Sequence, residues 1–526
     1  MAFPAKSGLL RGLTPTVTLA SLFLVAGVTA LGAVSGPAFE IALARTREVV
    51  TPVLESYYVG LVSVVLIFVI WLGVGRYKNV RLGGDDERPQ FSTFSWISML
   101  FAAGMGVGLI FWSVAEPVSH LQGNPFIPAG DGRTETDVAM RLTFFHWGLH
   151  GWSLFSLVAI VIGYFGFRHG LPLTMRSGLY PLLGKRIFGS AGDVMDTFTV
   201  VATVFGVVTT VGLGVQQLNA GLGVILGFGM SSAVQAALSF ALMALATGTL
   251  LGGLERGLRW VSELNFWLSV LLVGLFFGLG PTAHLMALAV QTTGDYLQNL
   301  VAQSFWSAAN EPSGWHGEWT VFYWGWWMAW SPFVGLFIAR ISRGRSLRQF
   351  VMGVLLAPVI ITFVWLAILG GTGLHLEVEH GVGLAEAVSQ DVATAFYHAI
   401  DALAPGTIGA FTAILVTVLI ALYLVTSASA GILVINTLLA YGGREHRPIH
   451  YILWGLAIAS LTVVLLGSGG VAPLQNAVIL ASIPFSVGVI AMVVGLERAL
   501  AEEVYGPRKG RHSCLPAEPW THIDDT

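Results

Sequence analysis

The chain has 526 residues, of which 55% are hydrophobic and only 10% are charged, too few charged side chains to cover a water-soluble protein of this length. The net charge of -3 comes with no basic block, so nothing points to a nucleic-acid partner. The one cysteine, Cys514, excludes an intrachain disulfide and argues against a thiol-based metal site. The composition therefore predicts an all-α integral membrane protein.

Apolar stretches long enough to cross a bilayer as helices recur along the chain. We expect twelve spans, near 14–34, 56–75, 93–115, 142–166, 196–227, 232–252, 258–280, 320–339, 349–371, 407–440, 450–467 and 473–496. The first follows Lys6 and Arg11 and ends in small residues, as a signal peptide does. Its apolar run is longer than a usual signal core, which favours a retained helix.

The basic residues indicate how the spans are oriented. With both termini in the cytoplasm, the 26 lysines and arginines all lie inside except Arg45, Arg47, Arg133 and Arg141. This is the positive-inside pattern of multi-pass membrane proteins, and an odd number of spans would destroy it. We therefore predict a plasma-membrane protein with both ends in the cytoplasm.

No soluble domain interrupts the predicted spans. The longest connection, 281–319, contains a stretch from Thr293 to Ala309 with the composition of an amphipathic helix lying on the outer surface. An ordinary capping loop is the alternative. We favour the surface helix.

Two spans carry residues that weaken a helix. In the third, Gly104, Gly106 and Gly108 alternate with other residues and cost about 1 kcal/mol each relative to alanine. In the eighth, Pro332 is expected to interrupt the helix. Close packing of small residues is an alternative reading of the glycines. A pair of broken spans in corresponding places instead favours an inverted-repeat transporter with its site at the midplane.

Aromatic residues gather on the fourth and eighth spans. Trp152 and Phe155 are three residues apart, as are Trp327 and Trp330, so each pair shares a helix face. For any single ring a place at the membrane interface is the alternative. Aromatic faces attract a quaternary ammonium, which has no N–H to donate, by about 2 kcal/mol or more when desolvated. Spans three to ten hold almost no acidic residue away from their ends, so we expect no carboxylate counter-ion.

Other kinds of site have less support. His146 and His150 are four residues apart, but no glutamate lies between them in the H-E-x-x-H manner and no third metal ligand is evident. The 13 histidines are scattered, and no convergent set of catalytic groups indicates an enzyme. A channel is the remaining alternative, because broken helices alone do not exclude it.

Long motifs in this order resemble those of the betaine/carnitine/choline transporter (BCCT) family. They are Gly104-Met105-Gly106-Val107-Gly108, Phe145-His146-Trp147-x-x-His150-x-Trp152, Phe322-Tyr323-Trp324-x-Trp326-Trp327-x-x-Trp330-Ser331-Pro332-Phe333 and Thr426-Ser427-Ala428. The resemblance covers about residues 10–500 and is strongest to the sodium-coupled glycine betaine carriers.

The resemblance implies a leucine-transporter-type fold with two inverted repeats, spans 3–7 and 8–12, commonly assembled as a homotrimer in the lipid of a bacterial inner membrane. The implied divisions are an N-terminal segment with spans 1 and 2 (1–92), the first repeat (93–280), a periplasmic connection with the surface helix (281–319), the second repeat (320–496) and a cytoplasmic tail (497–526).

The resemblance also implies which residues bind substrate. The box for a trimethylammonium group would consist of Trp147, Trp152, Phe155 and Trp327, with Trp330 below it on the path to the cytoplasm. Gly104 and Gly106 would offer backbone N–H groups to the substrate carboxylate. Phe155 departs from the tyrosine of the betaine carriers, a change that keeps the π face but bears on substrate preference.

Sodium is the coupling ion that the resemblance implies, with no other cofactor. Its first site would use the carbonyls of Ala102, Met105 and Tyr423 and the hydroxyls of Thr426 and Ser427. Alternatively, the two hydroxyls only bond their own helix. A second site is doubtful, because Thr203 and Phe333 match it but Val207 replaces a threonine. Ser429 also replaces an aspartate often found after Thr-Ser-Ala.

Two features of the sequence distinguish subtypes within the family. Gly108 lacks the acidic side chain typical of proton-coupled choline carriers, and 197–227 lacks the arginine of sodium-independent carnitine exchangers. The resemblance therefore implies sodium-coupled uptake of glycine betaine, or of a related quaternary ammonium or sulfonium compatible solute, by alternating access. A sodium-independent or proton-coupled carrier of choline or carnitine is the alternative. The long charged extensions of the family's osmosensors are not seen here, so we expect weak or absent osmotic activation.

Overall fold

The computed structural model describes residues 4–104, 106–126, 132–252, 255–309, 314–443, 447–507 and 513–516. Within these ranges the regular structure is helical, and the only β pairing consists of isolated bridges between Ala5 and Arg11 and between Arg81 and Ser346. The prediction of an all-α protein is therefore confirmed.

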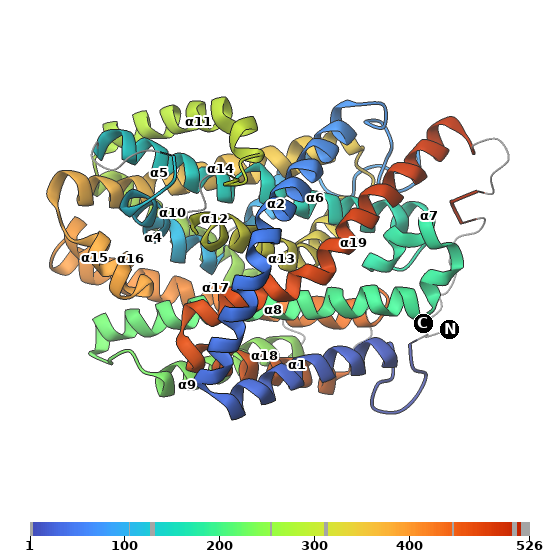
Figure 1. The fold of residues 1–526 in the computed structure, drawn as a ribbon, viewed down its shortest axis with the longest axis horizontal. Coiled ribbons are helices and arrows are strands. Elements are labelled where there is room, and N and C mark those ends of the chain that lie inside the picture. Colours follow the sequence, from blue (N-terminus) through green and yellow to red (C-terminus); the bar gives the residue numbers. More distant parts are fainter. Residues whose placement is uncertain are drawn as a thin grey trace.

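The first half of the chain forms helices that run back and forth through the molecule (Figure 1). They are α1 (Pro15–Ser35), α2 (Pro37–Val74), α3 (Thr93–Gly104), α4 (Val107–Gln122), α5 (Gly132–Trp147), α6 (Leu149–Gly163), α7 (Tyr180–Leu183), α8 (Ser190–Leu226), α9 (Ser232–Leu251) and α10 (Glu255–Leu279). A π-helical turn at Tyr164–Arg168 and 3-10 turns at Met175–Leu179 and Gly184–Phe188 lie between α6 and α8.

The second half has the same character. Its helices are α11 (Thr282–Ser304), α12 (Trp315–Glu318), α13 (Thr320–Ile341), α14 (Leu347–His380), α15 (Leu384–Gln390), α16 (Ala395–Leu403), α17 (Thr407–Leu439), α18 (Pro448–Gly469) and α19 (Val471–Tyr505). A 3-10 turn at Val392–Thr394 precedes α16. The short helix α7 lies at one end of the molecule, and α15 and α16 lie at the other (Figure 1).

Within the described residues, ten helices are long and apolar enough to cross a membrane. The two predicted spans outside this set are the third and the eighth. The third is divided between the short helices α3 and α4, and the eighth is α13. Tryptophan contributes little to mean hydropathy, so a tryptophan-rich helix such as α13 does not stand out by that measure.

Burial separates central helices from peripheral ones. In an apolar 18-residue stretch of each span, 94% of the residues are buried in Glu135–Arg168 and in Ser190–Leu226, against 28% in Pro15–Ser35 and 22% in Trp260–Leu279. Large apolar side chains such as Phe23 on α1 and Trp267 on α10 are exposed on the outside of the helix bundle. Such apolar outer faces are stable in lipid, where apolar surface needs no burial within the protein.

The third span is interrupted, as expected. Helix α3 ends at Gly104 and α4 begins at Val107, with Gly106 between them in an extended conformation. The Leu109 N–H donates to the Gly106 carbonyl at 3.1 Å and begins the new helix. Met105, which was assigned to the sodium site, lies outside the described residues.

The eighth span, in contrast, is not interrupted, and the expected break at Pro332 is wrong. Helix α13 continues through the proline. A proline cannot bond the carbonyl four residues before it, which here belongs to Met328. The Ser331 hydroxyl donates to that carbonyl at 2.8 Å and replaces the lost backbone bond.

A second interruption lies instead in the fourth span, at Gly148 between α5 and α6. The Leu149 N–H, freed by the break, donates to the Tyr296 hydroxyl of α11 at 3.1 Å. A Cβ on Gly148 would lie 2.8 Å from that hydroxyl oxygen and 2.5 Å from the Phe144 carbonyl oxygen, so only glycine fits. The break places Trp147 at the end of α5, beside the gap.

The long connection after the seventh span contains α11, which begins at Thr282, earlier than the predicted Thr293. Leu288 and Tyr296 are buried against the bundle, whereas Val290 and Val301 are exposed. Helix α11 packs on α5 and α14 and lies along the outer edge of the molecule in Figure 1.

Candidate functional site

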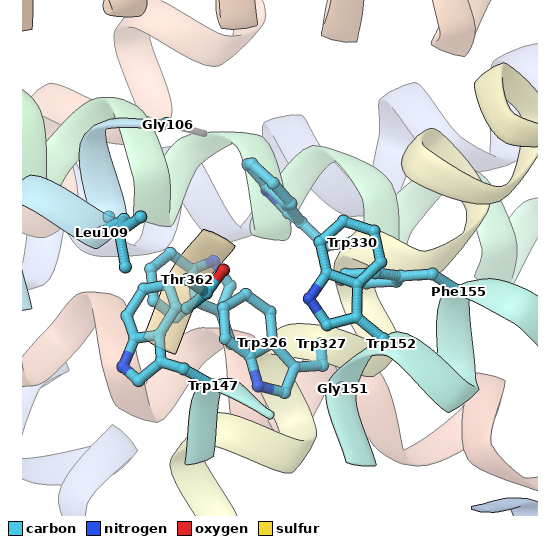
Figure 2. Close-up of a pocket in the computed structure, with 11 residues that line it drawn as sticks. Gly106, Leu109, Trp147, Gly151, Trp152, Phe155, Trp326, Trp327, Trp330 and Thr362 are labelled. Atoms are coloured by element: carbon cyan, nitrogen blue, oxygen red, sulfur yellow. The ribbon is translucent and has the colours of Figure 1, made fainter. Parts of the chain in front are cut away.

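A cavity lined by aromatic side chains lies where α13 meets α6 and α4 (Figure 2). Its lining residues are Gly106, Gly108, Leu109, Trp147, Gly151, Trp152, Phe155, Trp326, Trp327, Trp330 and Thr362. They include all five rings assigned to substrate and the glycine between α3 and α4. Gly104, the other assigned glycine, is the last residue of α3.

The four box rings meet edge to face. The ring centroids of Trp147 and Trp327 lie 5.1 Å apart at 73°. Phe155 lies 5.4 Å from Trp152 at 86° and 5.9 Å from Trp327 at 84°. Edge-to-face contacts are favourable between aromatic rings, and they turn successive ring faces in different directions. One space is thereby surrounded by several π faces.

Trp326 is a lining residue that the sequence did not single out. Its ring stacks on Trp327 at 5.0 Å and 9°, and it contacts the edge of Trp330 at 6.3 Å. A Cβ on Gly108 would lie 2.5 Å from the Trp326 ring. Any other residue at this position would therefore clash with the tryptophan. The spacing of Trp326 and Trp330, four residues on one helix, was the available signal.

Hydrogen bonds from three of the indole nitrogens orient the rings of Trp147, Trp327 and Trp330. Trp327 Nε1 donates to the His146 carbonyl at 2.9 Å, and Trp330 Nε1 donates to the Gly206 carbonyl of α8 at 3.2 Å. Trp147 Nε1 donates to Glu116 Oε2 at 2.7 Å. Because each N–H bonds to the surrounding protein, the ring faces are presented to the cavity.

Glu116, on α4, is fully buried and was missed by the sequence analysis. The third span was expected to end at 115, but α4 continues to Gln122, so this carboxyl group lies inside a helix of the bundle. The premise that the central spans hold almost no acidic residue away from their ends is therefore corrected. The available signal was an ionisable residue in an apolar run, which in a membrane protein indicates function.

Four hydrogen-bonding side chains surround this carboxyl group. Oε1 lies 2.7 Å from His146 Nδ1 and 3.3 Å from His120 Nε2, while Oε2 receives Trp147 Nε1 and the Tyr323 hydroxyl. Across the described residues, Glu116, His120 and His146 are the one group of three side chains close enough together to hold a metal ion. The second nitrogen of each histidine is also hydrogen-bonded: His146 Nε2 pairs with Thr320 Oγ1, and His120 Nδ1 accepts from Trp315 Nε1.

The two histidines considered together in the sequence do not converge. His150 Nε2 pairs with Ser304 Oγ of α11 at 2.9 Å, while its ring stacks on Trp324 at 5.2 Å and 21°. Trp324 is buried and lies outside the cavity lining. His150 and Trp324 thus belong to the packing between α6, α11 and α13.

The residues assigned to the first sodium site, apart from Met105, lie on α3 and α17. Thr426 Oγ1 donates to the carbonyls of Leu422 and Tyr423, both at 3.0 Å, and Ser427 is half-buried. Ala102 lies in the last turn of α3. These bonds are those of a threonine bonded to its own helix, the alternative that the sequence left open.

The residues assigned to the second sodium site make contacts with their own helices and with neighbouring ones. Thr203 Oγ1 donates to the Thr199 carbonyl at 2.8 Å, and Phe333 contacts the edge of Trp330 at 5.4 Å. Val207 faces Gly431 of α17, where a Cβ on the glycine would lie 2.8 Å from the valine side chain. Ser429 Oγ donates to the Val425 carbonyl at 2.7 Å and lies 3.1 Å from the Ala246 carbonyl of α9.

A bundle of helices long and apolar enough to cross a membrane, with a buried aromatic site beside a helix break, is the architecture expected of a membrane transporter. Comparison with known families makes the class specific. The profile described as BCCT, betaine/carnitine/choline family transporter, matches residues 16–505, and the chain belongs to this family.

Several characterised relatives are similar over most of their length. The chain is 38% identical to the glycine betaine transporter of Acinetobacter baylyi, over 94% of this chain and 75% of the relative. It is 36% identical to the glycine betaine transporter OpuD of Bacillus subtilis, over 94% of this chain and 96% of the relative. It is also 40% identical to the osmo-dependent choline transporter BetT2 of Acinetobacter baylyi, over 90% and 69% respectively.

Proposed function

We propose that this protein is a secondary active transporter that takes up glycine betaine, or a related quaternary ammonium or sulfonium compatible solute, coupled to sodium. One observation carries the proposal: Trp147, Trp152, Phe155 and Trp327 surround one cavity with aromatic rings. No charged side chain belongs to the described lining. A trimethylammonium group suits such a site, because it has a diffuse charge and no N–H for a hydrogen bond.

Sodium coupling by alternating access rests on family membership and on the residues at α3 and α17. Thr426 and Ser427 match the family's first sodium site, whereas Val207 removes an oxygen from the second. A sodium ion held between the broken third span and α17 would stabilise the same region that contacts substrate at Gly106. This arrangement would make substrate affinity depend on sodium.

Choline transport is the second candidate, supported by the choline-transporting relatives. Against proton coupling, Gly108 lies so close to the Trp326 ring that an acidic side chain there would displace the ring. Against sodium-independent exchange, 197–227 contains no lysine or arginine. The two solutes share the trimethylammonium group, so the aromatic rings alone do not separate them.

The experiment that tests the box is uptake by Trp327→Leu beside Trp324→Leu. Both variants remove a buried indole from α13, but only the first removes a wall of the cavity. Losing one desolvated ring is worth about 2 kcal/mol, so we expect the KM for glycine betaine to rise about thirtyfold in Trp327→Leu. If Trp327→Leu has wild-type surface expression and an unchanged KM for glycine betaine, the assignment of Trp327 to the substrate site is wrong.

The solute itself is identified by a binding screen. Tryptophan fluorescence of the purified protein would be titrated with glycine betaine, choline, carnitine, ectoine and dimethylsulfoniopropionate, each with and without sodium. The proposal expects the tightest binding for glycine betaine or a sulfonium analogue, and only with sodium. Tighter binding of choline or carnitine without sodium would favour the alternative.

A further inference from the structure

A carboxyl group lies immediately behind the aromatic box. Glu116 is fully buried, and its Oε2 accepts the indole N–H of Trp147, whose ring lines the cavity. The indole nitrogen lies on the side of Trp147 that is turned away from the other rings (Figure 2). The carboxyl group is thus separated from the substrate cavity by one indole ring.

The surrounding hydrogen bonds fit an ionised carboxylate. Trp147 Nε1 donates to it, since an indole nitrogen has no acceptor role. His120 Nδ1 accepts from Trp315 Nε1 at 3.3 Å, so the proton of its neutral ring is on Nε2 and points to Oε1. The Tyr323 hydroxyl and His146 Nδ1 complete the four contacts to the two oxygens.

The charge balance of this region supports the same state. Its four hydrogen-bond partners are two imidazoles, an indole and a phenol, and no arginine or lysine among the described side chains bonds to Glu116. A buried carboxylate is stabilised by several hydrogen-bond donors, but neutral donors leave its net negative charge in place. A cation that enters the neighbouring cavity would balance this negative charge.

We propose that Glu116, as an ionised carboxylate, supplies the negative charge that the lining of the cavity lacks, and so selects ligands by the positive charge of their trimethylammonium group. Glu116 is a positioning and electrostatic residue, which acts on the ligand through Trp147. This inference rests on the proposed function, because it assumes that a quaternary ammonium ligand occupies the box.

Two physical effects carry the influence of Glu116 into the cavity. Coulomb attraction is weakly screened here, because the buried Trp147 ring lies between the carboxyl group and the cavity. The hydrogen bond from Trp147 to a carboxylate also polarises the indole, and a more electron-rich ring attracts a cation more strongly. Both effects vanish for a ligand of the same shape without charge.

Ligands of matched shape and different charge therefore test the inference. Choline is a cation, glycine betaine is a zwitterion, and 3,3-dimethyl-1-butanol is the neutral carbon analogue of choline. Competition against radiolabelled glycine betaine would give the affinity of each for wild-type protein and for Glu116→Gln in detergent. We expect the affinity for choline to fall about tenfold or more in the variant and the affinity for glycine betaine to fall by less. The affinity for the neutral analogue should fall by less than about twofold.

A merely structural role for Glu116 predicts a different result, equal weakening of all three ligands, which would overturn the inference. Unchanged choline affinity would overturn it as well. Should Glu116→Gln not fold, Glu116→Met removes the charge with a side chain of similar volume, a kind of replacement that buried charged groups often tolerate. Glu116→Asp, which keeps the charge, is the matched control and should retain the preference for choline over its neutral analogue.

Failure of this inference is distinguishable from failure of the proposed function. If wild-type protein binds neither choline nor glycine betaine, the proposed function itself is wrong. If wild-type protein binds both and the charge-removing variants keep the same ratio of choline to neutral-analogue affinity, only the role of Glu116 is wrong.

Discussion

Phe155 contributes a ring face and no polar group to the box. Its ring meets the edges of Trp152 and Trp327, and 5% of its surface is exposed. Phe155→Tyr keeps the ring, so we expect glycine betaine affinity to stay within about threefold. Phe155→Leu removes the ring and should weaken binding about tenfold or more, because a desolvated ring contributes about 2 kcal/mol. Fluorescence titration of both variants measures the difference.

Phe155→Tyr keeps the ring, whereas Phe155→Leu keeps an apolar side chain but loses the π face together with some volume. Equal affinity of Phe155→Leu and Phe155→Tyr for glycine betaine would contradict a role for this ring in cation binding.

At the scale of residues, the sequence predicted the aromatic rings of the cavity better than the buried polar groups that hydrogen-bond to them. Trp147, Trp152, Phe155, Trp327 and Trp330 were identified from motifs, and the structure brings them to one cavity. The contacts of Glu116 were not predictable, because its partners come from α4, α5 and α13. Only its pairing with His120, one helical turn away, can be read from sequence spacing.

At the scale of elements, Ser331 is the residue that lets α13 pass through its proline. Ser331→Ala would leave the Met328 carbonyl without its hydroxyl donor. A buried carbonyl left unpaired costs about 1–3 kcal/mol, so we expect a lower apparent Tm in detergent. Ser331→Thr keeps the hydroxyl and serves as the control. A Tm for Ser331→Ala equal to that of the wild type would mean that the hydrogen bond does not support the helix.

Gly108 tests the close approach of α4 to α13. A Cβ at this position would lie 2.5 Å from the Trp326 ring, so Gly108→Ala must displace a lining residue of the cavity. Overpacking costs about 1–3 kcal/mol, and we expect both a lower apparent Tm and weaker glycine betaine binding.

The matched control for this substitution is Gly60→Ala on α2, where nothing lies within 4 Å of the added Cβ. Alanine in an open helical position is favoured over glycine by about 0.5–1 kcal/mol. The apparent Tm should therefore rise slightly in Gly60→Ala and fall in Gly108→Ala. A rise in both variants would show that Trp326 moves aside without cost.

Helix breaks illustrate why elements are harder to predict than spans. Glycines marked the break before α4, but Pro332 did not produce one, because Ser331 supplies the missing bond. Gly148 did produce one, because Phe144 and Tyr296 leave no space for a side chain. In each case the outcome depends on a neighbouring group, which residue composition alone does not reveal.

At the scale of the whole molecule, hydropathy located the spans but not their full extent. Helix α2 begins at Pro37, well before the predicted start at 56, and α19 continues to Tyr505, beyond 496. The added turns contain charged residues such as Glu40 and Arg498. Apolar windows detect only the part of a helix that matches the hydrocarbon layer, whereas a helix can continue into the aqueous phase.

The proposed coupling to sodium would be a property of the whole transport cycle. Proteoliposomes with an inward sodium gradient should accumulate glycine betaine above the external concentration, and replacing external sodium with potassium should abolish accumulation. A channel would only equilibrate the solute. Sodium-independent counterflow would instead indicate an exchanger.

The proposed sodium coupling can be tested at one side chain, Thr426. Thr426→Ala should raise the sodium concentration for half-maximal uptake about tenfold, because an ion site that loses one of few oxygen ligands binds weakly. Thr412→Ala is the matched control: Thr412 also lies on α17 and also donates to the carbonyl four residues before it, at 2.8 Å. Both variants lose the same helical bond, so equal sodium requirements would show that Thr426 only packs its helix, whereas a rise in Thr426→Ala alone would assign its oxygen to the ion.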